Sequence, residues 1–307
     1  MLTYLLRRLL SSLSTLLGVV TLTFFALRLL PGDPATMLVS QGGGTAEQIA
    51  ALQSQLGLDA PLIVQYMHFL NGLLRGDLGQ SLVTHRPVAE VIAEQIFHTV
   101  SLAVTATSLA VLLGILLGTL AAANQGTWVD RLCMALAVIG VSIPILLSGL
   151  LLMLLFSLTL GWLPATGQGS WRHLIMPALA LNLAFTGTIA RLVRAQLAEV
   201  LAQEYIVVAR AKGLHEITIL VRHALRNALI PVTTVIGLRF GSLLGGTVVV
   251  ETLFSRRGLG RLLVDAILWK DYPLVQGLVM LSAALYLTTN LAVDLGYGLL
   301  NPRIHHE

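Results

Sequence analysis

Residues 199–231, EVLAQEYIVVARAKGLHEITILVRHALRNALIP, form a long basic interruption between two apolar runs of the sequence. The apolar runs on both sides each approach the length that crosses a bilayer. Residues 204–212 suit a short helix, and Gly213 suits its C-terminal stop. A second helix is predicted over residues 215–228, because apolar residues recur there at three- and four-residue spacing. Two short helices joined at a glycine on the membrane surface would form a lever that another protein could push.

This stretch resembles the coupling loop of the permease subunits of bacterial ABC importers, and more narrowly that of the dipeptide, oligopeptide and nickel transport group. Within the loop, the resemblance is carried by EYIVVARAKGLHE at 204–216 and RHALRNALIP at 222–231. It extends over the whole chain, through LPGDPA at 30–35, QLGLDAPL at 55–62, GDLGQS at 76–81, VVVETLFSRRGLGRLLVDAI at 248–267, KDYPLVQG at 270–277 and NPRI at 301–304.

The resemblance implies that this loop docks into a cleft of an ATPase subunit. The residues expected at that contact are Glu204, Tyr205, Ala209, Arg210, Ala211, Lys212 and Gly213. The chain departs from the broader permease pattern, which begins Glu-Ala-Ala and has a glycine four residues after the last alanine. The corresponding residues here are Val207, Val208 and Ala209, so the acidic member is missing. An ordinary basic cytoplasmic loop is the alternative when the loop is considered alone.

The resemblance also implies an all-α polytopic membrane protein with six transmembrane helices and the type I ABC importer permease fold. The chain would pair with a second, homologous permease subunit and two ATPase subunits, and an extracytoplasmic solute-binding protein would deliver the solute. ATP and Mg²⁺ would be bound by the ATPase subunits, so this chain is expected to hold no cofactor and to be no enzyme. The expected cargo is a dipeptide or oligopeptide, with glutathione and nickel or a metallophore complex as alternatives.

The composition independently indicates a membrane protein. The 307 residues are 56% hydrophobic and 11% charged, with a mean hydropathy of +0.83, whereas soluble proteins carry about a quarter charged residues. The sequence pI near 9.6 does not indicate nucleic-acid binding, because no basic cluster is interleaved with aromatic residues. The single cysteine, Cys133, excludes an intrachain disulfide. No GxxxxGK[ST] motif is present, so the energy of transport must come from another subunit.

Six apolar runs are predicted to span the membrane, at 9–27, 97–123, 132–160, 173–193, 228–250 and 273–299. Six spans place both termini on one side, and the denser lysine and arginine residues there predict the cytoplasmic side of a bacterial inner membrane. Pro144 and Pro177 are expected to interrupt the third and fourth spans. The chain is therefore expected to have three regions. Residues 1–30 contain the first span, residues 31–95 lie outside the membrane, and residues 96–307 form the permease core with its cytoplasmic coupling loop 194–228.

Residues 31–95 form the only substantial polar excursion on the opposite side of the membrane. Thr45 and Gln48 have the spacing of a capping box, which predicts a helix that begins there. A second helix is predicted over 61–74, and one apolar stripe of it is expected to be buried, namely Ile63, Met67, Leu70 and Leu74. Such a small helical cap is a candidate contact for the solute-binding protein. The competing view is a passive lid that only packs on its own spans.

Two charged residues fall inside predicted spans, where a charge is costly and suggests a function. Arg239 lies near the middle of the fifth span, and Asp294 lies toward the cytoplasmic end of the sixth. Their depths differ by less than about 10 Å, which an arginine side chain can bridge. Two interpretations stay open, a buried ion pair between adjacent helices and an Arg239 that faces the substrate path and attracts a carboxylate.

Glycines at four-residue spacing occur at Gly114 and Gly118, and again at Gly237, Gly241 and Gly245. Such pairs let helices approach closely, either within this chain or toward a second permease. Two other classes of function would leave different signals in the sequence. An ion-coupled secondary transporter should show an internal repeat, and a membrane enzyme should show clustered ionisable residues. The sequence shows neither a convincing repeat nor such a cluster.

Overall fold

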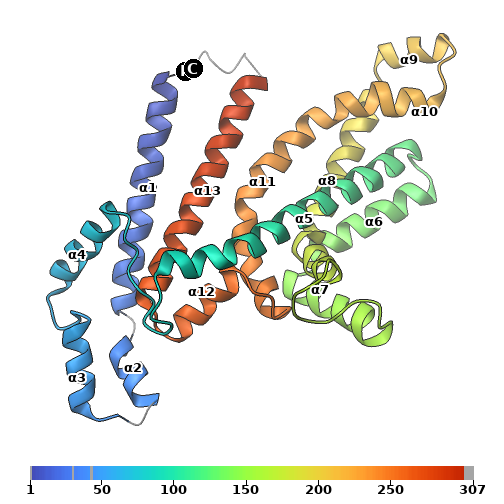
Figure 1. The fold of residues 1–307 in the computed structure, drawn as a ribbon. Coiled ribbons are helices and arrows are strands. Elements are labelled where there is room, and N and C mark those ends of the chain that lie inside the picture. The colour runs from blue at the N-terminus through green and yellow to red at the C-terminus, as the bar shows by residue number, and fades with distance from the viewer. Residues whose placement is uncertain (1, 30, 42–43, 301–307) are drawn as a thin grey trace. The chain divides into compact units, whose positions relative to one another are not determined.

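The computed structural model describes the backbone of residues 2–29, 31–41 and 44–300, and within them the side chains of all but 2–7, 40–41, 234, 238–246 and 292–300. The described chain is helical, with one isolated β-bridge between Gln80 and Pro87 (Figure 1). Its helices are α1 (Leu2–Leu29), α2 (Pro34–Gln41), α3 (Ala46–Gln55), α4 (Leu62–Leu74), α5 (Val88–Ala123), α6 (Trp128–Ser142), α7 (Ile145–Leu152), α8 (Arg172–Leu201), α9 (Glu204–Ala211), α10 (Glu216–Thr218), α11 (Leu225–Leu253), α12 (Leu259–Leu268) and α13 (Tyr272–Leu300), with π-helical turns at Met153–Thr159 and Ile219–Ala224.

Five helical segments among the described residues are long and apolar enough to cross a membrane. They are Arg8–Leu29, Val88–Ala123, Arg172–Leu201, Glu216–Gly237 and Tyr272–Leu291. A sixth span results if α6 and the helix that follows it count as one, although these are bent by 114° relative to each other. The predicted all-α polytopic architecture is therefore confirmed.

Pro144 causes the bend, as predicted. Proline lacks a backbone N–H and disfavours the helical conformation of the residue before it. Ile143 is accordingly extended, with φ −83° and ψ 123°, and Pro144 caps the start of α7. The expectation for Pro177 was wrong, because this residue lies inside α8 and the helix continues through it. Pro177 is the sixth residue of α8, so its missing N–H removes one i→i−4 hydrogen bond, that to the His173 carbonyl, without ending the helix.

The chain forms two compact units, each described here by itself. The first combines residues 1–98 with 258–291. Its core is built from the end of α1, the start of α5, α12 and the start of α13, through residues such as Leu27, Val88, Leu259 and Leu278. The loop before α5 is tied to the start of α13 by the buried carboxylate of Asp271, which accepts a 2.5 Å hydrogen bond from Ser81 Oγ and a 3.1 Å bond from the backbone N–H of Leu82.

Helices α3 and α4 of this first unit test two predictions for residues 31–95, the capping box and the buried apolar stripe. The capping box of α3 is present, with the Thr45 side chain accepting from the Gln48 N–H and the Gln48 side chain accepting from the Thr45 N–H. The predicted buried stripe of α4 was wrong. Ile63 is 68% exposed and Leu74 is 87% exposed, and no residue of α4 is buried. Helix α4 instead contacts α1 through a different set of side chains, which are Gln65, Tyr66 and Phe69.

The second unit covers residues 99–257 and packs α5, α6, α7 and α11 around α8. Small residues allow the closest approaches. A Cβ atom at Gly118 would lie 2.5 Å from the Ala190 carbonyl oxygen, and one at Gly187 would lie 2.2 Å from that of Ala137. The GxxxG pair of α5 therefore packs against α8 within this chain. An ion pair adds to the α6–α8 contact, because Arg194 donates two hydrogen bonds, of 2.5 and 2.7 Å, to Asp130.

Candidate coupling site

Helix α9 has the bounds that its sequence predicts to within one residue. Gln203 is extended and starts the helix, and Lys212 ends it. Gly213 follows with φ +77°, the left-handed conformation that terminates many helices. Its N–H donates to the Arg210 carbonyl at 2.9 Å, so the turn satisfies a carbonyl that the end of the helix leaves unpaired. Glycine is favoured here by the positive φ and not by lack of space, because a Cβ at this position would meet nothing within 4 Å.

The second predicted helix, 215–228, begins as expected but does not end at Ala228. His215 caps it, since its Nδ1 accepts a 3.3 Å hydrogen bond from the Ile217 N–H. The chain then passes through α10 and a π-helical turn directly into α11, which continues to Leu253. Pro231, three residues beyond the predicted end, lies inside α11 and does not interrupt the helix. The lever and the membrane-spanning helix are therefore one continuous helical segment.

One face of α9 is anchored and the opposite face is free. Ile206 is fully buried and Ala209 is 8% exposed, within a cluster that includes Leu197 of α8 and Ile219 of the π-helical turn. The outward face carries apolar side chains, Val207 at 58% and Val208 at 52% exposed. Exposed apolar side chains beside a fixed face are typical of a surface that another protein covers.

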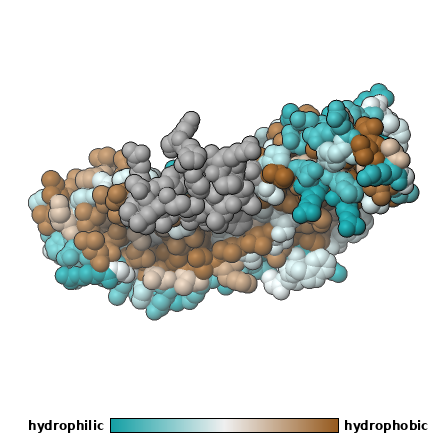
Figure 2. All heavy atoms as spheres, turned by 90° about the horizontal axis from the view of Figure 1, so that it is seen from above, coloured by the Kyte–Doolittle hydropathy of each residue, from teal (hydrophilic) through white to brown (hydrophobic). Residues whose placement is uncertain are grey.

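The other predicted contact residues divide in the same way. Ala209 belongs to the buried side, so it holds α9 in place and does not offer surface. The remaining six are exposed, which are Glu204, Tyr205, Arg210, Ala211, Lys212 and Gly213. Figure 2 shows hydrophilic atoms gathered over α9 and α10.

An ion pair closes the glycine turn. Arg210 Nε donates to Glu216 Oε1 at 2.8 Å, and Arg210 Nη2 donates to the other carboxylate oxygen at 3.2 Å. The hydrogen bond and the charge of Glu216 raise the pKa of Arg210 above its ordinary value. The pair fixes the orientation of α9 relative to α10 on both sides of Gly213, while both side chains stay in contact with solvent.

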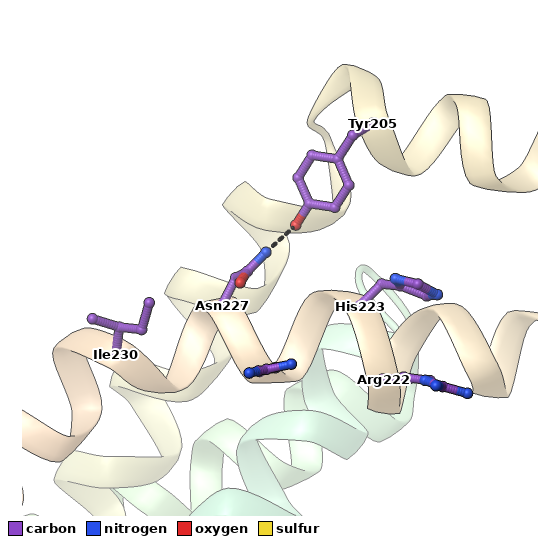
Figure 3. A pocket seen from close by; sticks show the side chains of 6 residues that line it. Tyr205, Arg222, His223, Asn227 and Ile230 are labelled. Carbon is purple, nitrogen blue, oxygen red and sulfur yellow. Dashed lines mark hydrogen bonds between the residues drawn. The ribbon is translucent and has the colours of Figure 1, made fainter.

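A pocket of about 460 Å³ opens between α9 and the start of α11 (Figure 3). Tyr205 and Asn227 lie on its wall and are joined by a 2.8 Å hydrogen bond, which Asn227 Nδ2 donates to the tyrosine oxygen. Arg222 and Arg226 are exposed there, and neither forms an ion pair with any residue that the structure describes. Sequence reasoning did not find this pocket. The full lining is Tyr205, Arg222, His223, Arg226, Asn227 and Ile230.

A second polar cluster escaped sequence reasoning. Glu251, near the end of α11, is fully buried and accepts a 2.7 Å hydrogen bond from Thr99 Oγ1. The backbone N–H of Arg256 donates to the Glu251 carbonyl at 2.8 Å. The Arg256 side chain is only 4% exposed, and burial lowers its pKa against the opposing effect of Glu251. The cue was an acidic residue inside the apolar run VVVETLF. We interpret the cluster as structural, because its hydrogen bonds hold the end of α11 against α5.

Two further predictions concern Arg239 and Asp294, whose side chains the structure does not describe. Arg239 belongs to α11 and Asp294 to α13, but both side chains lie outside the described ones. The proposed ion pair and the proposed place in a substrate path therefore stay predictions. Among the described residues, no group of three or more His, Cys, Asp or Glu side chains could hold a metal ion.

Family models match the chain over nearly its whole length. The model described as "Binding-protein-dependent transport system inner membrane component" matches residues 114–306. The model of the corresponding N-terminal region matches residues 1–103.

Similar proteins include the glutathione transport system permease protein GsiC of Salmonella typhimurium, strain LT2. It is 46% identical over 307 residues, which is 100% of both chains. The protein of the same description from Escherichia coli, strain K12, is 43% identical over the same length. Among solved structures, a chain from the crystal structure of an amino acid ABC transporter with histidines matches with a TM-score of 0.51 and 15% identity, over 70% of this chain and 94% of that one. At that identity the likeness supports the fold alone.

Proposed function

The chain belongs to the inner-membrane components of binding-protein-dependent transport systems, and from its role as an ABC importer permease we propose that α9 is the element through which an ATPase subunit drives it. The supporting observation is that α9 has one buried face and one exposed apolar face. Its inner face is fixed by Ile206 and Ala209, and its outer face offers Val207 and Val208 to a partner.

The continuity of the helices explains how a push on α9 would reach the membrane. A displacement of α9 is passed through the closed turn of Arg210 and Glu216 to α10, and α10 runs without interruption into α11. Because the candidate membrane span Glu216–Gly237 runs from α10 into α11, tilting α9 would tilt a membrane-spanning helix. In this proposal ATP and Mg²⁺ are held by the ATPase subunits, and this chain contributes movement without chemistry.

The pocket beside α9 suggests the chemistry of the contact. Two arginines and a histidine line it without a carboxylate among its lining residues. An acidic side chain of the ATPase subunit would be attracted into it and could accept hydrogen bonds from Arg222 and Arg226. The sequence lacks the acidic residue of the broader permease pattern in α9, so here the positive charge would be on the permease and the negative charge on its partner.

We propose glutathione or another small peptide as the cargo. Glutathione is itself a tripeptide, and permeases of glutathione transport systems share 43–46% of their residues with this chain over its full length. We further propose that a second, homologous permease completes the pore with two ATPase subunits, that both termini are cytoplasmic, and that the solute-binding protein meets residues 31–95. Nickel or a metallophore complex is the second candidate cargo.

The coupling proposal is tested by co-purification of the ATPase subunits with a tagged permease. Val208→Glu introduces a charge on the outer face of α9 and should abolish co-purification. Ala46→Glu introduces the same charge at an exposed position of α3 and serves as the control. Equal recovery of the ATPase subunits with both variants would overturn the proposal. Uptake of labelled glutathione, a dipeptide and Ni²⁺ by proteoliposomes with the complete transporter separates the candidate cargoes.

A further inference from the structure

Helix α4 carries three different surfaces. One faces α1 through Gln65, Tyr66 and Phe69. The second is an apolar stripe on the helix spacing, with Ile63 at 68%, Met67 at 57% and Leu74 at 87% exposed. The third is polar and also exposed, and it consists of His68, Asn71 and Arg75. In water the apolar stripe would be unfavourable, because large apolar side chains are stabilised by removal from water.

The contacts between α4 and α1 fix the depth of α4 relative to the first span. Tyr66 Oη and Thr21 Oγ1 share a 2.7 Å hydrogen bond, and the Phe69 ring stacks on Phe24 with centroids 5.4 Å apart. Thr21 lies eight residues before Leu29, the end of the span Arg8–Leu29. At a rise of about 1.5 Å per residue, Tyr66 therefore reaches about 12 Å inward from that end. Helix α4 lies beside the terminal third of the span.

The exposed surface of α1 at this depth is apolar as well. Leu22 is 72% and Leu29 is 79% exposed, and they flank Phe25, whose ring centroid lies 5.4 Å from that of Tyr66. An exposed apolar strip of α1, within a candidate membrane span, thus runs beside the stripe of α4. Figure 1 shows α4 beside the end of α1 from which the chain continues into α2.

The polar groups near this contact are satisfied within the chain, as an environment poor in water requires. Gln65 Oε1 accepts a 2.8 Å hydrogen bond from Arg28 Nε, and Gln65 Nε2 donates to the Leu58 and Ala60 carbonyls at 3.1 and 2.8 Å. The Arg28 guanidinium lies 3.5 Å from the centroid of the Phe24 ring. A helix with an apolar face and a polar face beside it, neither covered by protein, has the pattern of a helix that lies in the membrane interface.

We propose that α4 is an interfacial membrane helix, whose stripe Ile63, Met67 and Leu74 contacts lipid acyl chains while His68, Asn71 and Arg75 face the headgroups and water. Lipid is favoured as the occupant because the stripe adjoins the lipid-facing surface of a transmembrane helix at the depth of the bilayer. The inference rests on the membrane location of the family and not on the coupling proposal. It removes α4 from the surface available to a solute-binding protein.

Spin labels on single cysteines test the proposal in the complete transporter, reconstituted in proteoliposomes. The only native cysteine, Cys133, is replaced by alanine or, in a second background, by serine. Labels are placed at Ile63→Cys, Met67→Cys and Leu74→Cys, with His68→Cys and Asn71→Cys as controls on the same helix. Oxygen, which concentrates in lipid, should relax the first three labels several-fold more than a water-soluble nickel chelate does, and the controls should show the reverse.

Two results of the spin-label measurement would overturn the proposal. Dominant relaxation by the nickel chelate at all five positions would place α4 in water. Protection of the first three labels from both reagents would show that protein covers the stripe, either a second permease or the binding protein.

Thermal stability of variants without introduced cysteines gives an independent test. Met67→Asp should lower the thermal stability of the reconstituted transporter, whereas His68→Asp should not, and equal stability of the two variants would contradict lipid contact.

Discussion

Arg210 and Glu216 form a two-bond ion pair across Gly213, with the Nε–Oε1 distance at 2.8 Å, and this pair joins the two short helices of the coupling segment. Both side chains are exposed, and exposed ion pairs contribute little to stability. Its role is therefore orientation. The pair sets the angle at which α9 meets a partner, while the hydrophobic anchor of Ile206 provides the attachment.

Charge reversal tests that role. Arg210→Glu alone should leave thermal stability of the permease unchanged but lower solute-stimulated ATP hydrolysis by the reconstituted complex, because two carboxylates would then repel each other across the turn. The double variant Arg210→Glu with Glu216→Arg restores opposite charges and should recover most of the activity. If the double variant is as impaired as the single one, Arg210 acts by contact with the ATPase subunit and not through Glu216.

Gly213 is the second position where the turn can be tested. Its φ of +77° costs a residue with a Cβ about 1–2 kcal/mol, and a β-branched residue is the least suited to it. Gly213→Val should still insert into the membrane but lose association with the ATPase subunits. Gly213→Asn is the matched control, because asparagine tolerates the left-handed conformation, and it should retain association. Normal solute-stimulated ATPase activity of the valine variant in proteoliposomes would refute the role of this turn.

The anchor of the loop before α5 gives a prediction about folding. Asp271 is 1% exposed and accepts hydrogen bonds from Ser81 Oγ and from the backbone N–H groups of Leu82 and Leu274. In Asp271→Asn, the amide NH₂ would face one of these donors and leave it unpaired, which should cost about 1–3 kcal/mol. Ser81→Ala should cost less, about 1 kcal/mol. Thermal unfolding of the purified permease measures both, and an asparagine variant as stable as the wild type would contradict this account.

Close helix packing predicts opposite outcomes for two glycines. In Gly118→Ala the new Cβ would lie 2.5 Å from the Ala190 carbonyl oxygen, so α5 and α8 must separate, at about 1–3 kcal/mol. In Gly18→Ala the Cβ meets nothing within 4 Å, so the greater helix propensity of alanine should stabilise by up to about 1 kcal/mol. Melting temperatures in detergent compare the two. Equal shifts would mean that the α5–α8 contact is looser than the structure shows.

Local sequence patterns predicted where helices begin and end better than they predicted which side chains are buried. The bounds of α9, the capping box of α3 and the break at Pro144 were predictable because each depends on residues within one or two turns. The burial of α4 was predicted wrongly, because periodicity identifies an apolar stripe but not what covers it. The end of the second coupling helix was predicted wrongly at Ala228, because the helical segment continues past it and through Pro231. A membrane helix tolerates proline where other groups satisfy the freed carbonyl.

Contacts between distant residues could not be predicted at all. Ser81 and Asp271 lie 190 positions apart, and the basic pocket requires α9 to fold back onto the start of α11. Nothing in the local sequence reports such a pairing. The glycines of α5 were recognised as a close-packing motif, but only the structure identifies α8 as their partner.

Helices α2 and α3 are the part of residues 31–95 left for the solute-binding protein once α4 is assigned to the membrane. They are tied by Asp33, which accepts from the Thr36 N–H at 2.7 Å and from Gln53 Nε2 at 2.8 Å. Burial opposes ionisation of Asp33, but these hydrogen bonds outweigh it and lower its pKa. The tie is therefore present at neutral pH and is lost as the pH falls through that lowered pKa. Gln53 and the capping residue Gln48 are consequently unsuitable as probes of docking.

Exposed positions of α3 that make no such bond test the docking surface. Ala51 and Gln55 lie four residues apart on one face of α3, and both are exposed. We expect Ala51→Glu and Gln55→Arg to reduce the stimulation of ATP hydrolysis by loaded binding protein and to leave basal hydrolysis unchanged, because bulk and charge at a contact weaken docking without disturbing the fold. Asn71→Arg, on the polar face of α4, is the control and should respond as the wild type does. Stimulation that survives both α3 substitutions would exclude this face of α3 as the docking surface and favour the passive lid.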